Sequence, residues 1–372
     1  MVYRRYAWVE VDTSAIARNV RTLKSLTVPG TRFMAVVKAD GYGHGAVQAA
    51  HAALQAGADR LGVATLEEAA VLREAGIDVP IQVLSEAPTD GAGMIIEYAI
   101  IPTLATREFA VALSRAAMLA DVVVPYHLKI DSGMNRIGVR AEEACDMAVW
   151  LKALPGLQME GAFTHFATAD VPGDWEFDRQ VQRFATAVER LRTERVGPAV
   201  VHAANSAATI LHAETHLDMV RCGIAIYGLH PARSTYGRVD LTPAMAVKAR
   251  VSFVKRVGLG EGVSYGFTYH TAAPATIATV PMGYADGIHR LLSNNMEVLI
   301  GGRRCRQVGR ICMDQFMVEV PDSVDVHVGD EVVIVGEQGA ERITMDELAA
   351  QAQTINYELA CALALRMERR YR

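Results

Sequence analysis

The chain has 372 residues, of which 51% are hydrophobic and 21% charged, and its formal net charge is −5. This composition is typical of a globular protein with an ample apolar core, and the charge argues against a nucleic-acid or anionic-membrane partner. The start MVYRRYAWVEVD lacks the apolar stretch of a signal peptide and no apolar run approaches a membrane span, so neither a leader nor a membrane-spanning segment is expected. The five cysteines are scattered, odd in number and without a CxxC pair, which predicts reduced thiols in a cytoplasmic protein rather than disulfides or a metal site.

The first part of the chain alternates strand-like and helical patterns. The eight short apolar runs that we predict as strands are residues 33–37, 61–64, 81–84, 99–102, 125–130, 160–164, 199–203 and 219–224. Helical patterns between them include 46–56, 66–75, 106–118, 142–153 and 178–194. The strands are apolar throughout, as expected when both faces of a parallel sheet are covered. The pattern predicts an α/β fold, with a (β/α)8 barrel of the TIM type over residues 10–240.

The pattern changes after residue 240 and becomes mainly β. Strand-like segments are expected at 245–257, 276–281, 296–300, 316–320 and 326–336. Gly301 and Gly302 can both adopt the positive φ of a type I′ turn, so residues 298–308 are expected to form a hairpin. A helix is expected from about 345 to 366. We therefore assign residues 241–372 to a second, β-rich C-terminal domain.

Polar residues follow several of the predicted barrel strands. Lys38, Lys129, His165 and the pair at 205–206 fall at or just past strand ends, and Arg221 lies inside the last strand. In such a barrel the chemistry collects at the carboxyl ends of the strands. A single lysine at a strand end usually just reaches for water. A whole ring of polar residues at one end instead predicts a site.

The segment FMAVVKADGYGHG at 33–45 permits two interpretations. Gly41, Gly43 and Ala46 spell G-x-G-x-x-A between a strand and a helix, which is a weak dinucleotide fingerprint and would suit a nicotinamide-dependent dehydrogenase. In the other interpretation Lys38 is the reactive residue, because lysine forms Schiff bases with aldehydes such as pyridoxal phosphate. A phosphate cradle for that cofactor is available at Ser206, by a predicted helix start, and at Gly223 and Ile224.

Several longer motifs follow one another in order along the chain. They are VKADGYGHG (37–45), KIDSGMNRIG (129–138), HAANSAAT (202–209), RCGIAIYG (221–228), GVSYGFT (262–268), GYADG (283–287), GRICMDQ (309–315) and INYEL (355–359). In these motifs the sequence resembles the bacterial alanine racemase family over nearly its whole length. The C-terminal RMERRYR departs from the R-V-P-R ending common in that family.

The resemblance implies a fold, a cofactor and a reaction. Pyridoxal phosphate would be bound in the barrel, residues 1–9 would join the β-rich domain, and active sites would form between the two subunits of a homodimer. Lys38 and Tyr265 would be the two catalytic residues, and Tyr265 would come from the partner chain. They would exchange the α-proton of alanine on opposite faces of the cofactor's external aldimine, interconverting L- and D-alanine. D-alanine made in this way supplies cell-wall peptidoglycan.

The resemblance also implies roles for further residues. Those expected to hold the cofactor are Lys38, Tyr42, His165, Asn205, Ser206, Arg221, Gly223, Ile224 and Tyr357. Arg136 and the backbone N–H of Met313 would bind the substrate carboxylate, and Lys129 matches the position that is carbamylated in the family. Residues expected along an access channel are Tyr284 and Asp314, with Asp170, Arg290 and Arg310. No metal is expected.

To act as a base, Tyr265 needs neighbouring groups that stabilise its anion, because a phenol is almost fully protonated at neutral pH. His165 and Arg221 are the candidate neighbours. Without the resemblance, Tyr265 would be read as an ordinary strand aromatic. Two alternatives from other classes stay open: the nicotinamide-dependent dehydrogenase, and a pyridoxal-phosphate carrier without turnover. The carrier would resemble the barrel alone, whereas this chain has a second domain that contains Tyr265.

Overall fold

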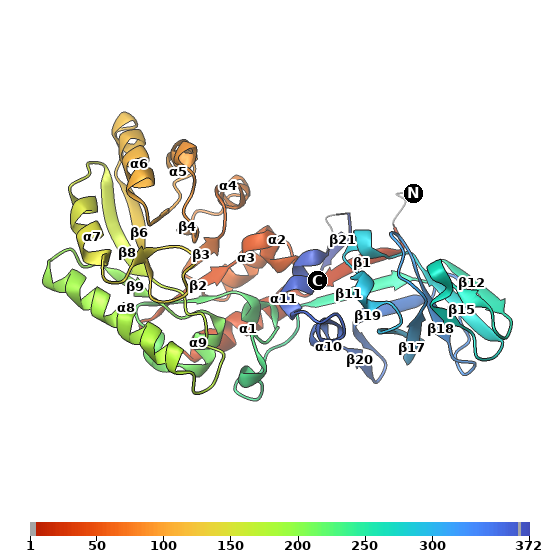
Figure 1. Ribbon diagram of the computed structural model, residues 1–372. Helices are drawn as coiled ribbons and strands as arrows, with labels where there is room; N and C mark the ends of the chain where they lie inside the picture. Colours follow the sequence, from red (N-terminus) through yellow and green to blue (C-terminus); the bar gives the residue numbers. More distant parts are fainter. Residues whose placement is uncertain (1–4, 364–365) are drawn as a thin grey trace. The chain divides into compact units, whose positions relative to one another are not determined.

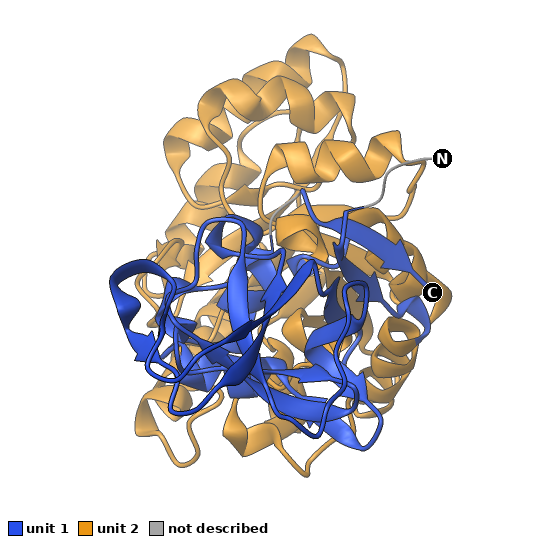
Figure 2. Cartoon of the chain, turned by 90° about the vertical axis from the view of Figure 1, so that its right-hand side faces the viewer, with its two compact units in different colours: residues 1–14, 42–45, 243–372 blue, residues 15–41, 46–242 orange. Residues whose placement is uncertain are grey.

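The computed structural model describes residues 5–363 and 366–372 and shows two compact units (Figure 2). Unit 1 comprises residues 1–14, 42–45 and 243–372, and unit 2 comprises residues 15–41 and 46–242. The division at 242/243 lies close to the expected boundary at 240/241. The short segment 42–45 groups with unit 1, although it interrupts the sequence of unit 2.

Unit 2 is built around a parallel sheet of eight strands in the order β4-β3-β2-β10-β9-β8-β6-β5 (Figure 1). The strands are β2 (Arg32–Val36), β3 (Arg60–Val63), β4 (Ile81–Val83), β5 (Thr103–Leu104), β6 (Val124–Asp131), β8 (Leu157–Phe163), β9 (Val200–His202) and β10 (Met219–Cys222). A parallel bridge between Gln82 and Ile101 links the β4 and β5 ends of this order. The short β7 (Val139–Arg140) pairs with β6. The predicted TIM-type barrel is confirmed.

The main helices of unit 2 lie around this sheet, as Figure 1 shows. They are α1 (Thr13–Ser25), α3 (Ala46–Gln55), α4 (Leu66–Glu74), α5 (Ala92–Glu97), α6 (Arg107–Leu119), α7 (Ala144–Lys152), α8 (Trp175–Thr193) and α9 (Ser206–Leu211). Side-chain caps decide several of their starts. Thr65 and Glu68 form a capping box on α4, and Asp174 caps α8, so α8 begins three residues before the predicted 178. The helix α5 was not predicted.

Unit 1 contains a sheet in the order β12-β15-β18-β17-β16-β19-β11-β1-β21, with β20 paired to β19. Its strands are β1 (Ala7–Val11), β11 (Met245–Arg250), β12 (Phe253–Val257), β15 (Ala275–Val280), β16 (Glu297–Ile300), β17 (Arg303–Val308), β18 (Phe316–Val320), β19 (Glu331–Gln338), β20 (Glu341–Ile343) and β21 (Glu368–Tyr371). The N-terminal strand β1 pairs antiparallel with β11 and parallel with β21. The hairpin β16–β17 turns at Gly301 and Gly302, whose φ values of 58° and 73° are those the sequence predicted.

The predicted C-terminal helix is wrong in extent. In place of one helix over 345–366, the chain forms α10 (Met345–Gln351) and α11 (Asn356–Ala362), and then β21. Gln353 between the two helices has a φ of 56°, and such a left-handed residue ends the hydrogen-bond ladder of α10. Residues 364 and 365, within the predicted helix, lie outside the described residues. The strand expected at 245–257 is likewise two strands, β11 and β12.

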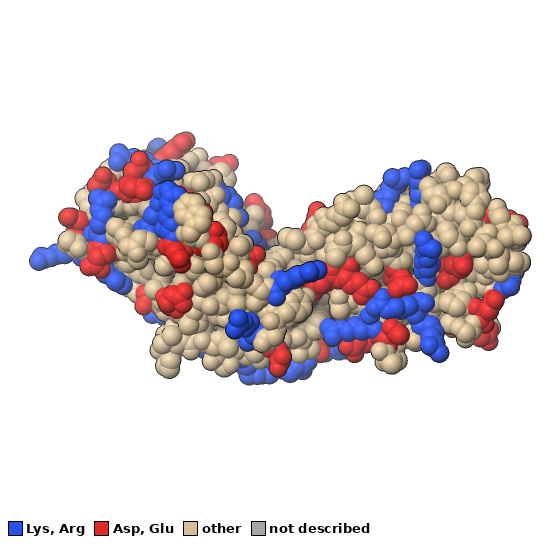
Figure 3. Space-filling model, turned by 60° about the horizontal axis from the view of Figure 1, so that its bottom comes forward, with Lys and Arg blue, Asp and Glu red and all other residues tan. Residues whose placement is uncertain are grey.

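Over the described part of the chain, neither the surface charge nor the cysteines indicate a functional site. Basic and acidic side chains are interspersed over the face shown in Figure 3. Three of the five cysteines, Cys145, Cys222 and Cys305, are buried thiols outside any disulfide. Among the described residues, no helix has the length and apolarity needed to cross a membrane, and no group of His, Cys, Asp or Glu side chains could hold a metal ion.

Candidate active site

Lys38 stands two residues beyond β2, at the start of α2 (Lys38–Tyr42). This short element is an unusual turn, because Ala39, Asp40 and Gly41 have φ values of 52°, 50° and 61°. Side chains hold the turn: Asp40 accepts a hydrogen bond from the Ala46 N–H at 2.8 Å, and Glu68 accepts one from the Ala39 N–H at 2.6 Å. Left-handed backbone in non-glycine residues is costly and persists where surrounding contacts fix it. The turn therefore places Lys38 rigidly at the carboxyl end of the strand.

Lys129 lies within β6 and is only 4% exposed. Its Nζ is 4.8 Å from the centroid of the Phe163 ring. Burial, together with the charges of Arg221 and Arg136, holds the pKa of Lys129 well below its ordinary value. Gly138 passes so close to the Lys129 side chain that a Cβ there would lie 3.1 Å from its Cγ. Lys129 is therefore a buried amine that readily loses its proton, rather than a solvated surface lysine.

Arg136 lies on the loop that follows β6. The Asp131 carboxylate shapes this loop by accepting hydrogen bonds from the N–H groups of Gly133, at 3.0 Å, and Asn135, at 3.1 Å. The Arg136 side chain is exposed, yet its charge reaches the barrel interior, where it lowers the pKa of Lys129. The loop thus brings a guanidinium to the same end of the barrel as Lys38.

Arg221 of β10 is 3% exposed and donates to four acceptors. Its Nη2 donates to the carbonyl oxygens of Thr164 and Ala203, at 2.8 and 2.9 Å, and to Nδ1 of His165 at 3.2 Å. Its Nη1 donates to Nδ1 of His202 at 3.1 Å. Burial lowers the pKa of Arg221 to about 9. The guanidinium plane is thus fixed by hydrogen bonds to neutral acceptors.

His165 links the predicted barrel residues electrostatically. Burial first, and then the charges of Arg221, Lys129, Arg136 and Lys38, hold the pKa of His165 well below its ordinary value. The imidazole is therefore neutral, and because Nδ1 accepts from Arg221, the ring proton is on Nε2. The charges of Lys38, Lys129, Arg136 and Arg221 thus all act on His165 at this end of the barrel.

Three of the predicted phosphate residues, Ser206, Gly223 and Ile224, lie in unit 2. The Gly223 N–H donates to the Ser206 hydroxyl at 2.9 Å, and Ile224 opens the short 3-10 helix η3 (Ile224–Tyr227), whose first N–H groups lack intrahelical acceptors. Asn205 caps α9 by accepting from the Ala208 N–H at 3.0 Å, and its amide also donates to the Phe166 carbonyl at 3.4 Å. In these contacts, Asn205 orients the segment that carries Ser206.

Unit 1 carries Tyr265 on a strained turn. Tyr265 begins the 3-10 helix η5 (Tyr265–Phe267) and is 71% exposed. The residues on either side, Ser264 and Gly266, have φ values of 65° and 69°. The Ser264 hydroxyl donates to the Arg310 carbonyl at 2.6 Å, and a Cβ on Gly266 would lie 3.0 Å from the Arg310 guanidinium. The turn is therefore held against segment 309–313 and presents the phenol outward.

Met313 lies on the same segment, close to Tyr284 in the fold of unit 1. The Tyr284 N–H donates to the Cys312 carbonyl at 3.1 Å, and the Ala285 N–H donates to the Met313 carbonyl at 3.0 Å. Asp314 pairs with Arg366 at 2.8 Å. Arg366, in the C-terminal segment that departs from the family's usual ending, therefore contacts Asp314, the residue next to Met313, and this contact was not predicted.

Tyr42 and Tyr357, both in unit 1, lie near each other. Their ring centroids are 6.2 Å apart, and Tyr42 is buried. For two of the predicted channel residues, Asp170 and Arg290, the structure gives only local contacts. Asp170 accepts through its carbonyl from the Ser234 hydroxyl at 2.7 Å, and Arg290 begins the 3-10 helix η7 (Arg290–Leu292).

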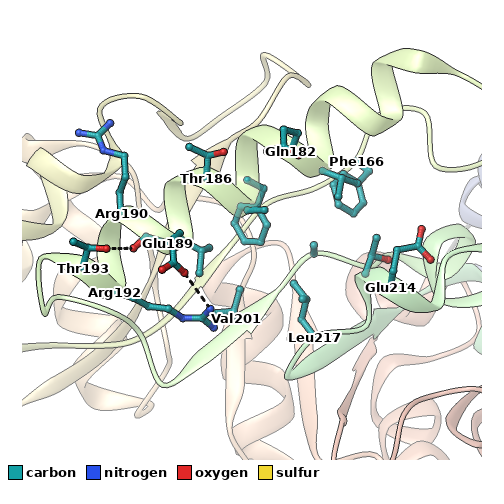
Figure 4. Close-up of a pocket in the computed structure, with 16 residues that line it drawn as sticks. Phe166, Gln182, Thr186, Glu189, Arg190, Arg192, Thr193, Val201, Glu214 and Leu217 are labelled. Atoms are coloured by element: carbon teal, nitrogen blue, oxygen red, sulfur yellow. Dashed lines mark hydrogen bonds and ion pairs between the residues drawn. The ribbon is translucent and has the colours of Figure 1, made fainter.

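A cavity of about 600 Å³ lies elsewhere, between α8 and the segment 214–217 (Figure 4). Phe166, Phe184 and Val201 are among the residues that line it, together with charged residues such as Glu189 and Arg192. None of the described residues that line this cavity belongs to the set predicted from the sequence. Cavity size therefore does not locate the chemistry in this chain.

The sequence interpretation missed several residues that contact this site. His202 and Phe163 are buried beside Arg221, and His127 and Glu160 lie beyond His202. The spacing of His127 and Lys129, two residues apart on one strand, was the available signal, since such residues share a face of the sheet.

Comparison with known proteins settles the family. The sequence matches the alanine racemase N-terminal domain over residues 11–231 and the alanine racemase C-terminal domain over residues 244–371.

The chain belongs to the alanine racemase family.

Two curated relatives and one solved structure illustrate how close the likeness is. The alanine racemase of Symbiobacterium thermophilum is 47% identical over 367 residues, covering 99% of this chain and 97% of that protein. That of Desulfovibrio desulfuricans is 45% identical over 369 residues, covering 99% of each chain. The crystal structure of alanine racemase from Bacillus anthracis with bound L-Ala-P has a TM-score of 0.94 at 40% identity, covering 100% of this chain and 96% of that one. The resemblance found in the sequence motifs is confirmed.

Proposed function

We propose that this protein is a pyridoxal-phosphate-dependent racemase that interconverts L- and D-alanine. Membership of the alanine racemase family supports the proposal. The observation that carries it is the gathering of Lys38, Lys129, Arg136 and Arg221 around neutral His165 at the carboxyl end of the barrel strands. So many basic groups at one end of the barrel favour an anionic ligand, and an amine among them can bond an aldehyde.

Pyridoxal phosphate suits this donor set. The Lys38 amine would hold its aldehyde, and the Ser206 hydroxyl, the N–H groups of Gly223 and Ile224 and the hydroxyls of Tyr42 and Tyr357 would hold its phosphate. Asn205 would keep the Ser206 segment in place. When bound, the cofactor supplies an electron-withdrawing ring that makes the α-proton of the attached amino acid removable.

Arg221 would face the ring nitrogen of the cofactor. A guanidinium has donors and no acceptor, so it leaves that nitrogen unprotonated, unlike a carboxylate partner. The ring then withdraws electrons less strongly. Arg221 would in this way limit side transamination, in which the proton returns to the wrong carbon.

Racemisation needs a proton-transfer group on each face of the α-carbon. Lys38 would serve one face and Tyr265 of the partner subunit the other. His165 suits the task of stabilising the tyrosine anion, because its Nδ1 accepts from Arg221 and its Nε2–H is available to donate. The same contact fixes the imidazole in orientation.

Arg136 and the Met313 N–H would bind the substrate carboxylate, which is a strong charge-assisted arrangement. Lys129 would carry a carbamate. Its lowered pKa supports this, because the neutral amine is the form that reacts with carbon dioxide. The resulting anion would lie near Arg136 and replace a repulsion between like charges with an attraction.

We further propose a homodimer with shared active sites. Large apolar side chains are exposed around the Tyr265 turn in a single chain: Tyr265, Phe267, Tyr284, Leu291 and Met313. A partner subunit would cover them. Residues 1–9 would belong with the C-terminal β-rich domain, beginning at 241, and the barrel would span residues 10–240.

Tyr284, Asp314, Asp170, Arg290 and Arg310 would line the access channel. A narrow channel would favour the methyl side chain of alanine, although a few methylenes are worth only about 1–3 kcal/mol, so slower turnover of serine is expected. The protein would act in the cytoplasm and supply D-alanine for peptidoglycan.

The decisive experiment follows the α-proton of each alanine enantiomer in deuterated water. We expect exchange with inversion, a yellow protein, and covalent fixation of the chromophore on Lys38 by borohydride. A colourless protein that binds a nicotinamide dinucleotide would instead favour the dehydrogenase suggested by Gly41, Gly43 and Ala46. A yellow protein that never exchanges the α-proton would be a carrier.

A further inference from the structure

A chain of hydrogen bonds leads from Arg221 through the barrel interior to a carboxylate that no motif singled out. Arg221 Nη1 is 3.1 Å from His202 Nδ1, and His202 Nε2 is 2.7 Å from His127 Nδ1. His127 Nε2 is 3.1 Å from Glu160 Oε2. Glu160 is in turn paired with Arg60, whose Nη1 donates to Oε2 at 3.0 Å and whose Nη2 donates to Oε1.

The donors and acceptors in this chain can be ordered in one way. Arginine only donates, so His202 Nδ1 accepts and a neutral His202 carries its proton on Nε2. That proton faces His127 Nδ1, which therefore accepts, and the His127 proton lies on Nε2 and is donated to Glu160. Burial holds the pKa of both His202 and His127 below the ordinary value, so both rings are neutral. All hydrogen bonds thus point from the guanidinium toward the carboxylate.

The packing around the two imidazoles is specific. Phe163 stacks on His202, with ring centroids 4.7 Å apart and an angle of 5° between the planes. Gly161 lies against His127, and a Cβ at this position would overlap the imidazole ring. Both histidines are fully buried, whereas the Glu160 side chain is 25% exposed. The rings therefore have one place and one orientation, and the chain ends at a partly solvated anion.

We propose that Glu160 is a positioning residue for Arg221, acting through His127 and His202. As an acceptor-only carboxylate it satisfies the last N–H of the chain and holds both imidazoles as the Nε2–H tautomer. The lone pair of His202 then stays aimed at Arg221 and fixes the guanidinium plane. This role rests on the proposed function, in which Arg221 faces the cofactor ring. Arg60 holds Glu160 but takes no part in ordering the imidazoles.

The test compares three variants of the holoenzyme. Glu160→Met removes the acceptor at similar size, Glu160→Gln keeps a carbonyl acceptor without the charge, and Arg60→Met removes the ion pair but leaves the carboxylate on His127. We expect kcat/KM for alanine to fall about 10- to 100-fold in Glu160→Met, well short of the roughly 10⁴-fold cost of a wrong histidine tautomer in a serine protease, because His202 contacts Arg221 and not the reacting atoms. Glu160→Gln should recover most of this loss, and Arg60→Met should stay within about threefold of the unmodified protein.

Nitrogen-15 NMR of histidine-labelled protein gives a readout independent of turnover. The signals of His127 and His202 can be assigned from their loss in His127→Asn and His202→Asn proteins. We expect both rings to be pure Nε2–H tautomers in the unmodified protein, Glu160→Gln and Arg60→Met, and mixed tautomers in Glu160→Met.

Three outcomes would overturn the proposal. The first is an Nδ1–H tautomer for either ring in the unmodified protein, which needs no variant to fold. The second is unchanged tautomers and activity in Glu160→Met. The third is an equal loss in Glu160→Gln, Glu160→Met and Arg60→Met, which would assign the effect to the ion pair. If the unmodified protein does not racemise alanine, the proposed function fails, while the NMR spectra still decide the tautomers.

Discussion

In the barrel unit, Arg221 is 3% exposed and donates to four acceptors, whereas Tyr265 of the β-rich unit is 71% exposed on a turn with positive φ on both sides. The barrel residue is fixed by its own chain. The tyrosine side chain is exposed in a single chain. Under the proposed shared site of a homodimer, one half of the site is complete on folding, and the other half is completed by association.

Replacing Lys38 should produce the largest effect. A proton-transfer group contributes roughly 10²–10⁴-fold, and Lys38 would also anchor the cofactor, so Lys38→Ala should lose about 10⁴-fold or more of its kcat/KM for alanine. Borohydride should no longer fix the chromophore to the protein. Lys129→Gln is the matched control, because Lys129 is the other lysine of the proposed site. If the label persists in Lys38→Ala and disappears in Lys129→Gln, the two lysines have been assigned the wrong way round.

Tyr265→Phe should lose about 10²–10⁴-fold, again because it removes one proton-transfer group. It also tests the division between the units directly. Lys38→Ala and Tyr265→Phe subunits, each nearly inactive, should recover about a quarter of full activity when dissociated and reassociated together. Half of the random dimers are mixed, and one of the two sites in each mixed dimer then has both groups intact. No recovery would mean that Lys38 and Tyr265 act within one chain.

For the barrel half of the proposed site, the sequence predicted candidates at the strand ends, and the structure places two of them, Arg221 and His165, 3.2 Å apart. Lys38, His165 and Arg221 were found because a parallel barrel brings all strand ends to one face, whatever their separation in the chain. Tyr265 was found through the family motif alone, since an exposed aromatic in a β-rich segment carries no periodic signal. Its role therefore still depends on the mixed-dimer experiment.

What the sequence could not predict are features decided by long-range contacts. The left-handed backbone of Ala39 and Asp40 depends on Glu68, 29 residues from Ala39. The pairing of His127 with His202 spans 75 residues and requires the register of three strands. The break at Gln353 within a continuous helical pattern is likewise a tertiary effect, because α10, α11 and β21 pack in unit 1 as separate elements.

Arg221→Glu should change the outcome of the reaction more than its rate. A carboxylate beside the ring nitrogen can share a proton with it, which strengthens electron withdrawal and favours transamination. We expect the ratio of pyruvate released to alanine racemised to rise about tenfold, measured with a coupled pyruvate assay. Arg221→Gln, which offers no comparable acid, is the control. An unchanged ratio in Arg221→Glu would contradict the role proposed for the arginine.

The buried histidines of the barrel should make stability depend on pH, in contrast to the exposed turn of unit 1. The pKa values of His127, His165 and His202 are lowered, chiefly by burial, so in the unfolded chain these groups bind protons near pH 6.5 while the folded chain excludes them. Stability therefore rises with pH through this window, and it is lost as the pH falls below about 6.5 toward the folded pKa values, by about 1.4 kcal/mol per pH unit for each histidine that stays neutral.

Urea unfolding between pH 7.5 and 5.0 measures the slope of the unfolding free energy against pH. This range lies above the pH at which the carboxylates Glu160 and Asp286 are protonated. His202→Asn removes one buried imidazole and should flatten the slope, whereas Tyr265→Phe should leave it unchanged. A slope that is equally steep in His202→Asn would mean that His202 binds its proton equally well in the folded and the unfolded chain, and the one-way chain of hydrogen bonds from Arg221 to Glu160 could not then exist.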